Sequence, residues 1–361
     1  MNEGAREESC PTDSGPSPSQ ASEQMGAEVK TFEFYVKREA AQTAVRPAGG
    51  AQPHRRIDSY LASRFPDYSR TFIKKLMEQG AVTVGGVPVK PSYAPRPGDH
   101  VIARVPVLSG ASVEPEDIAL DILYEDDWIV VVNKPPDMVV HPAKGHQSGT
   151  LVNALAYHCE KLSSYSGELR SGIVHRLDRD TSGVILLVKD ESVHQSIAQQ
   201  FESRRVRKEY VAVCEGRVEL DSNVIEAPIG PHARLAERMA VRFDVGREAK
   251  TVYEVVERLG EFTVVRCFPH TGRTHQIRVH LQHIGHPIVC DASYGRRDAI
   301  YPSDLTGEES QPFEEPILDR QALHARRLII HHPVLGRELC FEAPMPADMM
   351  ALIRALRERV A

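Results

Sequence analysis

A dense cluster of charged side chains lies immediately before an apolar run near the middle of the sequence. It supplies an imidazole, two guanidinium groups and two carboxylates within six positions: His175, Arg176, Asp178, Arg179 and Asp180. Charges beside a buried strand are costly unless they are paired, so such a cluster usually marks a site. Carboxylates can act as nucleophiles or as proton acceptors. Asp178 is therefore the first candidate for a catalytic residue, and Asp180 is assigned a structural role.

Two further polar clusters interrupt apolar surroundings farther along the chain. Tyr210 opens an apolar stretch after the basic run 204–208. His275, Gln276 and Arg278 stand at the start of an expected helix. Each has an ordinary structural explanation, since a tyrosine at a strand start is usually a core residue and an arginine can pair with any surface acid. Three such insertions together favour one shared site.

The clusters resemble the sequence signatures of the RluA-type pseudouridine synthases. The matching segments are His175-Arg176-Leu177-Asp178-Arg179-Asp180-Thr181-Ser182-Gly183, Asn133-Lys134-Pro135, His141-Pro142, Lys208-Glu209-Tyr210, 271–278, Gly285-His286-Pro287 and Leu323-His324-Ala325. The resemblance implies isomerisation of uridine in RNA to pseudouridine. In that reaction the glycosidic bond breaks, the uracil turns within the site and a carbon–carbon bond forms.

The resemblance also implies roles for the clustered residues. Asp178 is expected to act as a nucleophile or to help form a glycal, Arg278 to pair with it, and Tyr210 to stack on the detached uracil. The residues expected to bind substrate are His175, Arg176, Arg179, His275 and Gln276, with the run 204–208 contacting phosphates. The reaction changes no oxidation state, and the sequence holds no nucleotide-binding glycine loop or metal-ligand cluster. We therefore expect neither a cofactor nor a metal.

Residues 54–106 are expected to form a compact basic unit. The segment 55–104 carries nine Lys/Arg against four Asp/Glu, although the whole chain has a net charge of −6. Helical spacing predicts two helices, with buried faces formed by Ile57, Leu61 and Phe65 and by Ile73, Leu76 and Met77. A hairpin with a Gly85-Gly86 turn follows. This pattern resembles the S4 RNA-binding domain, and the expected RNA-contacting residues are Arg56, Arg70, Lys74 and Lys75.

The expected elements divide the chain into four parts. They are a disordered or weakly structured extension (1–53, with a short strand at 31–36), the S4-like domain (54–106), a linker (107–117) and the larger domain (118–361). In the larger domain we expect strands at 122–124, 128–132, 184–188, 210–214, 251–256, 262–268 and 328–331, and helices at 151–158, 193–204, 274–284 and 347–357. This mixture predicts an α+β fold with a mostly antiparallel sheet, beside a small α/β domain. Residues 296–320 are expected to form a surface excursion.

Composition restricts the setting in which the protein works. Six widely spaced cysteines fit neither a zinc site nor a disulfide framework. No apolar run reaches the length of about 20 residues that crosses a bilayer, and the N-terminus lacks a signal-peptide pattern. We expect a cytoplasmic protein without membrane contact, and nothing in the sequence requires more than a monomer.

Several alternatives remain at this stage. Residues 65–70 and 319–324 resemble the members of this family that act on large-subunit ribosomal RNA, which favours that RNA as the substrate. Transfer RNA is the alternative. A glycoside hydrolase would use two carboxylates from separate segments flanking the scissile bond, whereas Asp178 and Asp180 share one turn. A non-catalytic RNA-binding or ribosome-assembly protein would be expected to have lost Asp178, Tyr210 or Arg278, and all three are present.

Overall fold

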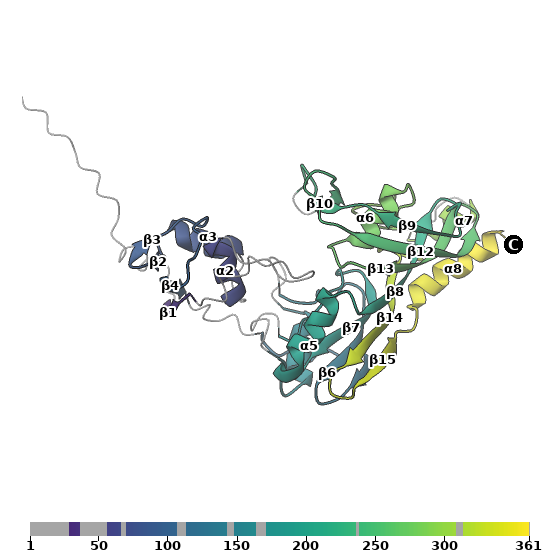
Figure 1. Ribbon diagram of the computed structural model, residues 1–361. Helices are drawn as coiled ribbons and strands as arrows, with labels where there is room; N and C mark the ends of the chain where they lie inside the picture. Colours follow the sequence, from purple (N-terminus) through teal and green to yellow (C-terminus); the bar gives the residue numbers. More distant parts are fainter. Residues whose placement is uncertain are drawn as a thin grey trace, which may run out of the picture. The chain divides into compact units, whose positions relative to one another are not determined.

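The computed structural model describes residues 29–36, 56–65, 70–106, 113–142, 148–163, 171–235, 238–307 and 313–360. The chain divides into two compact units, residues 1–112 and 113–361. Figure 1 shows both units, with labels on most of their helices and strands. Most of the extension expected over 1–53, and residues 107–112 of the expected linker, lie outside the described residues.

The N-terminal unit packs two helices against a small sheet. Its elements are β1 (Val29–Tyr35), α2 (Ile57–Arg64), α3 (Arg70–Glu78), β2 (Val82–Val84), β3 (Val87–Pro88) and β4 (His100–Pro106). The strands lie in the order β1-β4-β2-β3 with antiparallel pairing. The apolar faces predicted for both helices are buried. Gly85 and Gly86 both have positive φ, 58° and 84°, which agrees with the expected two-glycine hairpin turn.

The sheet of this unit begins earlier in the chain than the sequence indicated. β1 pairs with β4 along its whole length, from Val29 opposite Pro106 to Tyr35 opposite His100. Aromatic side chains of β1 also pack against the helices. Residues 29–36 therefore belong to the folded unit, and the short strand expected at 31–36 is part of its sheet.

A nine-stranded sheet runs through the C-terminal unit. Its order is β5-β6-β7-β14-β8-β13-β12-β9, with β15 paired to β14. The strands are β5 (Ile122–Glu125), β6 (Ile129–Lys134), β7 (Ser182–Val188), β8 (Arg207–Glu215), β9 (Ser222–Glu226), β12 (Lys250–Leu259), β13 (Phe262–Pro269), β14 (Leu323–His332) and β15 (Arg337–Glu342). Among the described pairings, β7 and β14 are parallel and the others are antiparallel. The predicted α+β fold with a mostly antiparallel sheet is confirmed.

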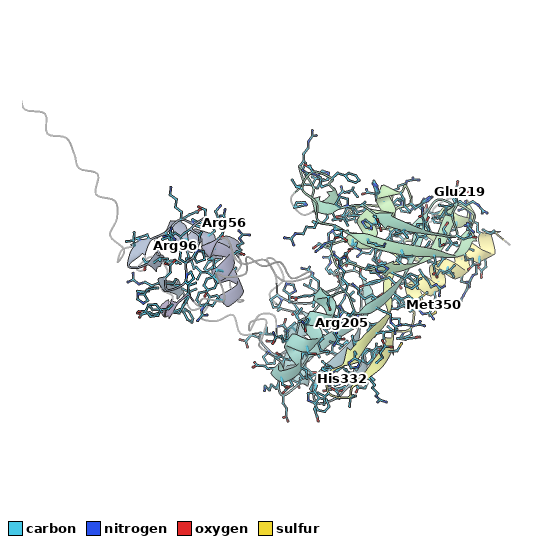
Figure 2. The ribbon with its side chains drawn as sticks, viewed as in Figure 1. Arg56, Arg96, Arg205, Glu219, His332 and Met350 are labelled. Carbon is cyan, nitrogen blue, oxygen red and sulfur yellow. The ribbon has the colours of Figure 1, made fainter. Side chains whose placement is uncertain are left out.

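Helices cover this sheet and position the loops at its edge. They are α4 (Leu151–His158), α5 (Glu191–Glu202), α6 (Gln276–His283), α7 (Pro302–Thr306) and α8 (Ala347–Val360). α5 packs on β7 and β14, α6 on β12 and β13, and α8 on β12. Figure 2 shows the side chains that fill the spaces between these elements. The core is built largely from strands that are buried along their length, such as β7.

Some elements were not predicted from the sequence. They are β9, β15, α7 and a short ribbon of β10 (Ile229–Pro231) and β11 (Met239–Val241). Within β9 only Ile225 is buried. Its sequence lacks the alternation of apolar and polar residues that predicts a strand. The excursion expected over 296–320 is anchored, because Ile300 pairs with Leu318 and both are buried. Its residues 308–312 lie outside the described part of the chain.

Gly183 is the second residue of β7, just after the charged turn, and it cannot be replaced without strain. Its φ is 112°, and a Cβ atom there would overlap the backbone of Ala325 on the parallel strand β14. We expect Gly183→Ala to lower the free energy of unfolding by at least about 2 kcal/mol, because overpacking and a strained backbone act together. Denaturant unfolding measures this.

A matched glycine separates the two contributions. Gly336 also has a positive φ, 65°, but a Cβ there meets no atom within 4 Å. Gly336→Ala should therefore cost only the backbone conformation, about 1 kcal/mol. Equal losses for Gly183→Ala and Gly336→Ala would contradict the close approach of β7 and β14.

Candidate active site

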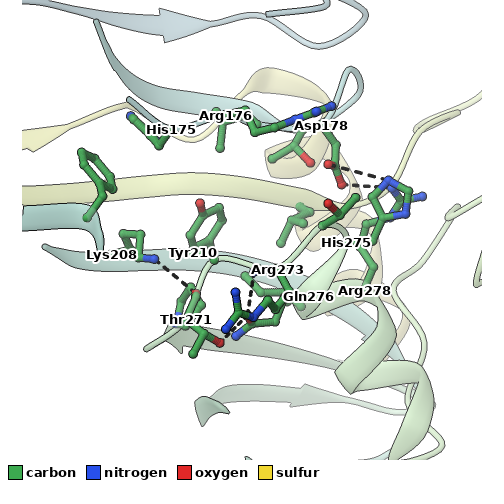
Figure 3. A pocket seen from close by; sticks show the side chains of 18 of the residues that line it. His175, Arg176, Asp178, Lys208, Tyr210, Thr271, Arg273, His275, Gln276 and Arg278 are labelled. Carbon is green, nitrogen blue, oxygen red and sulfur yellow. Dashed lines mark hydrogen bonds and ion pairs between the residues drawn. The ribbon is translucent and has the colours of Figure 1, made fainter. Parts of the chain in front are cut away.

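Three segments that are far apart in the sequence meet at one cavity of about 420 Å³. The turn before β7 contributes residues 174–178, β8 contributes Lys208 and Tyr210, and the loop that enters α6 contributes residues 271–278. Figure 3 shows their side chains gathered around the same space. The three polar clusters of the sequence thus line a single site.

Asp178 is held by an arginine that is itself held by a second aspartate. Nη1 of Arg278 donates to Oδ2 of Asp178 at 3.0 Å, while its Nε and Nη2 donate to the two carboxylate oxygens of Asp291 at 2.6 and 2.8 Å. The Asp291 side chain is fully buried, whereas 19% of the Asp178 side chain is exposed. The bidentate contact fixes the plane of the guanidinium, which then presents one donor to the accessible carboxylate.

The charge of Arg278 is secured by its two partners. Burial alone lowers the pKa of the guanidinium, but the hydrogen bonds and charges of Asp291 and Asp178 raise the pKa above its ordinary value. Arginine is in any case protonated at all working pH values. Asp178 therefore has a permanent positive neighbour of fixed orientation.

His275 approaches the other oxygen of the Asp178 carboxylate. Its Nε2 lies 3.8 Å from Oδ1, and its Nδ1 lies 2.8 Å from the hydroxyl of Tyr294. That hydroxyl accepts the backbone N–H of Met239 and can donate its own proton to Nδ1, and in that arrangement the ring proton is on Nε2, which faces Asp178. Burial lowers the pKa of His275 although the Asp178 charge acts against it, and the ring is therefore neutral near pH 7.

Tyr210 forms a half-buried wall of the cavity. Burial, together with the charge of Asp178, raises the pKa of its phenol, so the hydroxyl keeps its proton at neutral pH. A flat ring with a protonated hydroxyl can support a base by stacking and can also donate a hydrogen bond. The strand begins at Arg207, so Tyr210 lies inside β8 rather than at its first position.

His175 lines the cavity, but its ring is also committed to the fold. Nε2 accepts the backbone N–H of Leu186 at 2.9 Å, and the ring stacks on Phe201 with centroids 4.6 Å apart. Burial, followed by the charge of Lys208, lowers the pKa of His175 to about 3. It can therefore contact a substrate only as a neutral ring, and it offers no positive charge to a phosphate.

Gln276 was expected to bind substrate, and the structure gives it a different task. Its Oε1 accepts from the Thr271 hydroxyl and the Arg273 backbone, and its Nε2 donates to the Lys250 carbonyl and the Thr251 hydroxyl. The side chain is buried, and a primary amide donates two hydrogen bonds and accepts two. No hydrogen-bonding capacity is left for a substrate. Gln276 instead holds the loop that leads into α6.

The two exposed arginines of the charged turn differ in position. Arg176 lines the cavity, whereas Arg179 does not. Arg179 is turned toward carboxylates, with Nε 3.0 Å from Asp180 and 3.6 Å from Asp137. Asp180 thus forms an ion pair and does not line the cavity. Two carboxylates flanking a scissile bond, as a glycoside hydrolase requires, are not presented by this turn.

The basic run 204–208 divides between the cavity and the outer surface. Arg204 and Lys208 line the cavity. Arg205 is exposed at the surface after α5 (Figure 2), and Arg207 pairs with Glu338 at 2.8 Å. Only part of this run can therefore contact an RNA strand that enters the cavity.

Residues outside the predicted set complete the site. Asp291 and Tyr294 come from the turn after α6, and Lys134 ends β6. The Lys134 amine is fully buried and donates to three backbone carbonyls, one of them that of Arg179 directly after Asp178. Burial lowers its pKa to about 7. In the sequence, Asp291 is a single acid directly after the apolar residues 288–290, and this pattern could have indicated it.

The four predicted RNA-contacting residues fall into two groups. Arg56 and Arg70 both donate to Asp58, a buried carboxylate, at 3.0 and 3.2 Å. Lys74 and Lys75 are exposed on α3, and the described residues provide neither with an ion pair. The two lysines are thus the better placed to meet phosphates.

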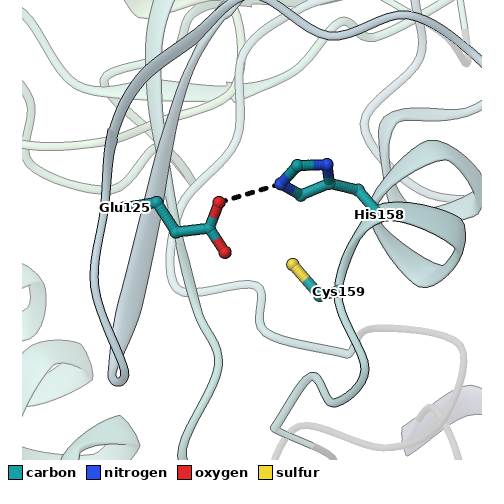
Figure 4. A group of neighbouring side chains, drawn as sticks. All are labelled: Glu125, His158 and Cys159. Carbon is teal, nitrogen blue, oxygen red and sulfur yellow. Dashed lines mark hydrogen bonds and ion pairs between the residues drawn. The ribbon is translucent and has the colours of Figure 1, made fainter.

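A separate cluster in the C-terminal unit combines Glu125, His158 and Cys159 (Figure 4). Glu125 already pairs with His158 at 2.8 Å and with Lys189 at 2.6 Å. Burial, with the charge of Glu125, raises the pKa of the Cys159 thiol to about 11. The ion pairs of Glu125 and the protonated thiol of Cys159 account for this cluster without a metal.

Two expectations from composition can be compared with the described residues. Cys159, Cys214, Cys267, Cys290 and Cys340 are free thiols, while Cys10 lies outside the described part of the chain. No described helix is both long and apolar enough to cross a membrane.

Similarity to known proteins agrees with the geometry of the site. The RNA pseudouridylate synthase family matches residues 128–283, and the S4 domain family matches residues 55–101. The chain is 44% identical to an uncharacterized RNA pseudouridine synthase of Bacillus subtilis, over 86% of this chain and 97% of that protein. The chain belongs to the RNA pseudouridine synthase family. This synthase is also 39% identical to the ribosomal large subunit pseudouridine synthase D of Vibrio vulnificus, over 85% of its own length and 92% of the relative.

Membership of the family assigns the enzyme class. The synthase is an isomerase that converts uridine in RNA to pseudouridine, and its S4 domain indicates RNA as the partner. A similar protein of Aquifex aeolicus, 41% identical over 84% of this chain and 94% of its own, is likewise named an RNA pseudouridine synthase.

Proposed function

We propose that the synthase modifies uridines of large-subunit ribosomal RNA and that Asp178 is its catalytic carboxylate. The observation that carries the catalytic part is the contact of Asp178 with the buried, doubly held Arg278 at the edge of a cavity. The substrate is supported by similarity to ribosomal large subunit synthases of Vibrio vulnificus and Pseudomonas aeruginosa, both 39% identical.

Asp178 can start the reaction in two ways, and both use the same geometry. In one, its carboxylate attacks C1′ of the ribose and displaces the uracil, which leaves a covalent intermediate. In the other, it removes the C2′ proton and a glycal forms. Arg278 orients the carboxylate in either route, and the neutral His275 ring lies 3.8 Å from its second oxygen.

The target uridine must leave its stack in the folded RNA to reach Asp178. Extrusion costs a few kcal/mol and is offset by contacts to the flipped nucleotide and its phosphates. The cavity of about 420 Å³ lies in the range of small-molecule sites. Tyr210 supports the detached base, so that the base rotates without escaping. Arg176 lines the cavity as an exposed cation, and Arg204 lines it while paired with Glu248 at 3.2 Å.

The exposed lysines of α3 lead to a prediction for the S4 domain. Lys74→Ala combined with Lys75→Ala should weaken RNA binding and reduce the slope of log K against log salt by about 2, one for each lost phosphate contact. Binding measured at several salt concentrations tests this. Arg354→Ala with Arg359→Ala removes the same charge from exposed positions of α8 and serves as the control. An unchanged slope in the α3 variant would show that this face does not contact phosphate.

Tritium release tests the proposed substrate. RNA that contains 5-tritiated uridine loses label when C5 forms its new bond to the sugar. We expect release from large-subunit ribosomal RNA transcripts and none from transfer RNA transcripts. Release from transfer RNA alone would overturn the ribosomal assignment and would leave the enzyme class intact.

A further inference from the structure

Lys208 lines the cavity beside Tyr210 but has no part in the steps above. The two residues are two positions apart on β8, and alternate side chains of a strand point to the same face. Nζ of Lys208 donates to the backbone carbonyl of Thr271 at 3.3 Å (Figure 3). The amine is therefore fixed next to the ring that supports the uracil.

Lys208, which is half-buried, differs from the buried cations of the site in its partners. Arg278 contacts two carboxylates, and Lys134 donates to three carbonyls. The described residues give Lys208 no ion pair and one long hydrogen bond, although an ammonium group has three donors. A desolvated ammonium in this state is stabilised by an anionic ligand.

The reaction creates such an anion at this place. When the C1′–N1 bond breaks, its electron pair stays on the base, and the negative charge spreads over N1 and the two carbonyl oxygens of uracil. The carboxylate of Asp178 lies in the same cavity and does not stabilise this charge. The described donors of Arg278 are directed at Asp178 and Asp291.

We propose that the Lys208 ammonium contacts a carbonyl oxygen of the detached uracil and stabilises its negative charge, an inference that rests on the proposed function. The lysine forms no covalent bond and keeps its proton throughout. When C5 of the rotated base attacks C1′, the electron pair of the anion becomes the new carbon–carbon bond. On the covalent route the pair of the Asp178–C1′ bond returns to the carboxylate, and on the glycal route C2′ regains the proton held by Asp178. The base is then neutral, and N1 takes up a proton as the C5 proton leaves to another acceptor.

This contact makes the reaction sensitive to pH. Burial lowers the pKa of the Lys208 amine to about 8, so the ammonium is present below this pH and is lost as pH rises through it. The other ionisable groups around this part of the cavity are His175, Glu202, Arg204, Tyr210 and Arg273. His175 stays neutral, Tyr210 keeps its proton and the two arginines stay charged in this range. Burial lowers the pKa of Lys134 to about 7, but Lys134 does not line the cavity, so we assign a decline near pH 8 to Lys208.

Single-turnover tritium release and RNA binding, measured on the full-length protein, test the proposal. Lys208→Gln should slow the rate by about 10²–10³-fold, as for other lost donors to a developing charge, while the Kd for RNA changes less than about threefold. Lys208→Arg keeps the charge and should move the alkaline decline of the rate to higher pH. Arg207→Gln, a neighbouring charge paired with Glu338 outside the cavity, should behave as wild type.

The outcomes separate this proposal from the function on which it rests. Weaker RNA binding at an unchanged rate would mean that Lys208 contacts a phosphate, and it would overturn the proposal. An unaltered rate in Lys208→Gln would also overturn it. If Lys208→Gln does not fold, Lys208→Arg provides the test. A rate that declines at the same pH in Lys208→Arg as in wild type would overturn the proposal. A wild-type protein that releases no tritium would contradict the proposed function itself.

Discussion

We expect Asp178→Asn to lower the single-turnover rate of tritium release on the order of 10⁴-fold or more while RNA still binds. The amide can neither attack C1′ nor accept the C2′ proton, so both routes are lost. The substitution keeps the shape of the side chain. It exchanges a partly exposed carboxylate for an amide, so the fold should persist. Rate and Kd, measured on the same RNA, distinguish lost chemistry from lost binding.

Asp180→Asn provides the control two residues away. Asp180 pairs with the exposed Arg179 and does not line the cavity. Exposed pairs contribute little to stability, so this variant should stay within a few-fold of the wild-type rate. If Asp178→Asn were also active, Asp178 would not be the catalytic carboxylate.

The second large effect is expected at Asp291. Asp291→Asn removes the charge that holds two donors of Arg278 and leaves a buried cation with one carboxylate partner. We expect a loss of about 3 kcal/mol in the free energy of unfolding, as is typical when one member of a buried pair is removed. The guanidinium should also lose its fixed orientation, and a shift of about 1 Å can cost about 10²-fold in rate.

Two measurements separate these effects of Asp291. Denaturant unfolding gives the stability, and single-turnover rates at a temperature where the variant is folded give the positioning effect. Asp244→Asn removes a carboxylate from an exposed pair with Arg242 and should leave both quantities near wild type. A folded Asp291→Asn protein with the wild-type rate would show that Arg278 needs no second anchor.

The reacting groups could be recognised from the sequence, but the residues that hold them in position could not. Asp178, Tyr210 and Arg278 stand out because each is polar within an apolar stretch. Asp291 and Tyr294 become partners of the site through the turn after α6, and the single acid after an apolar stretch does not reveal which residue Asp291 contacts. Lys134 stood in a segment that matched the family but was given no role, because lysine is rarely buried completely. Gln276 was misassigned because its four hydrogen bonds depend on β12 and the preceding loop.

The fold was predictable where a repeating pattern was long. The buried strands and the helices α4, α5 and α8 follow their apolar periodicity, with boundaries displaced by a few residues. β14 was predicted over 328–331 but begins at Leu323. Its first half was not predicted because His324, Arg326 and Arg327 interrupt the apolar pattern there. Short strands with one buried residue, such as β9, carried no usable signal.

Mapping of pseudouridine in ribosomal RNA tests the central claim most directly. Carbodiimide-based sequencing would be applied to large-subunit ribosomal RNA from a strain that lacks this gene and from the same strain supplied with wild type or Asp178→Asn. The account predicts that at least one pseudouridine disappears in the deletion strain and returns only with the wild-type protein. An unchanged map in the deletion strain, or restoration by Asp178→Asn, would contradict it.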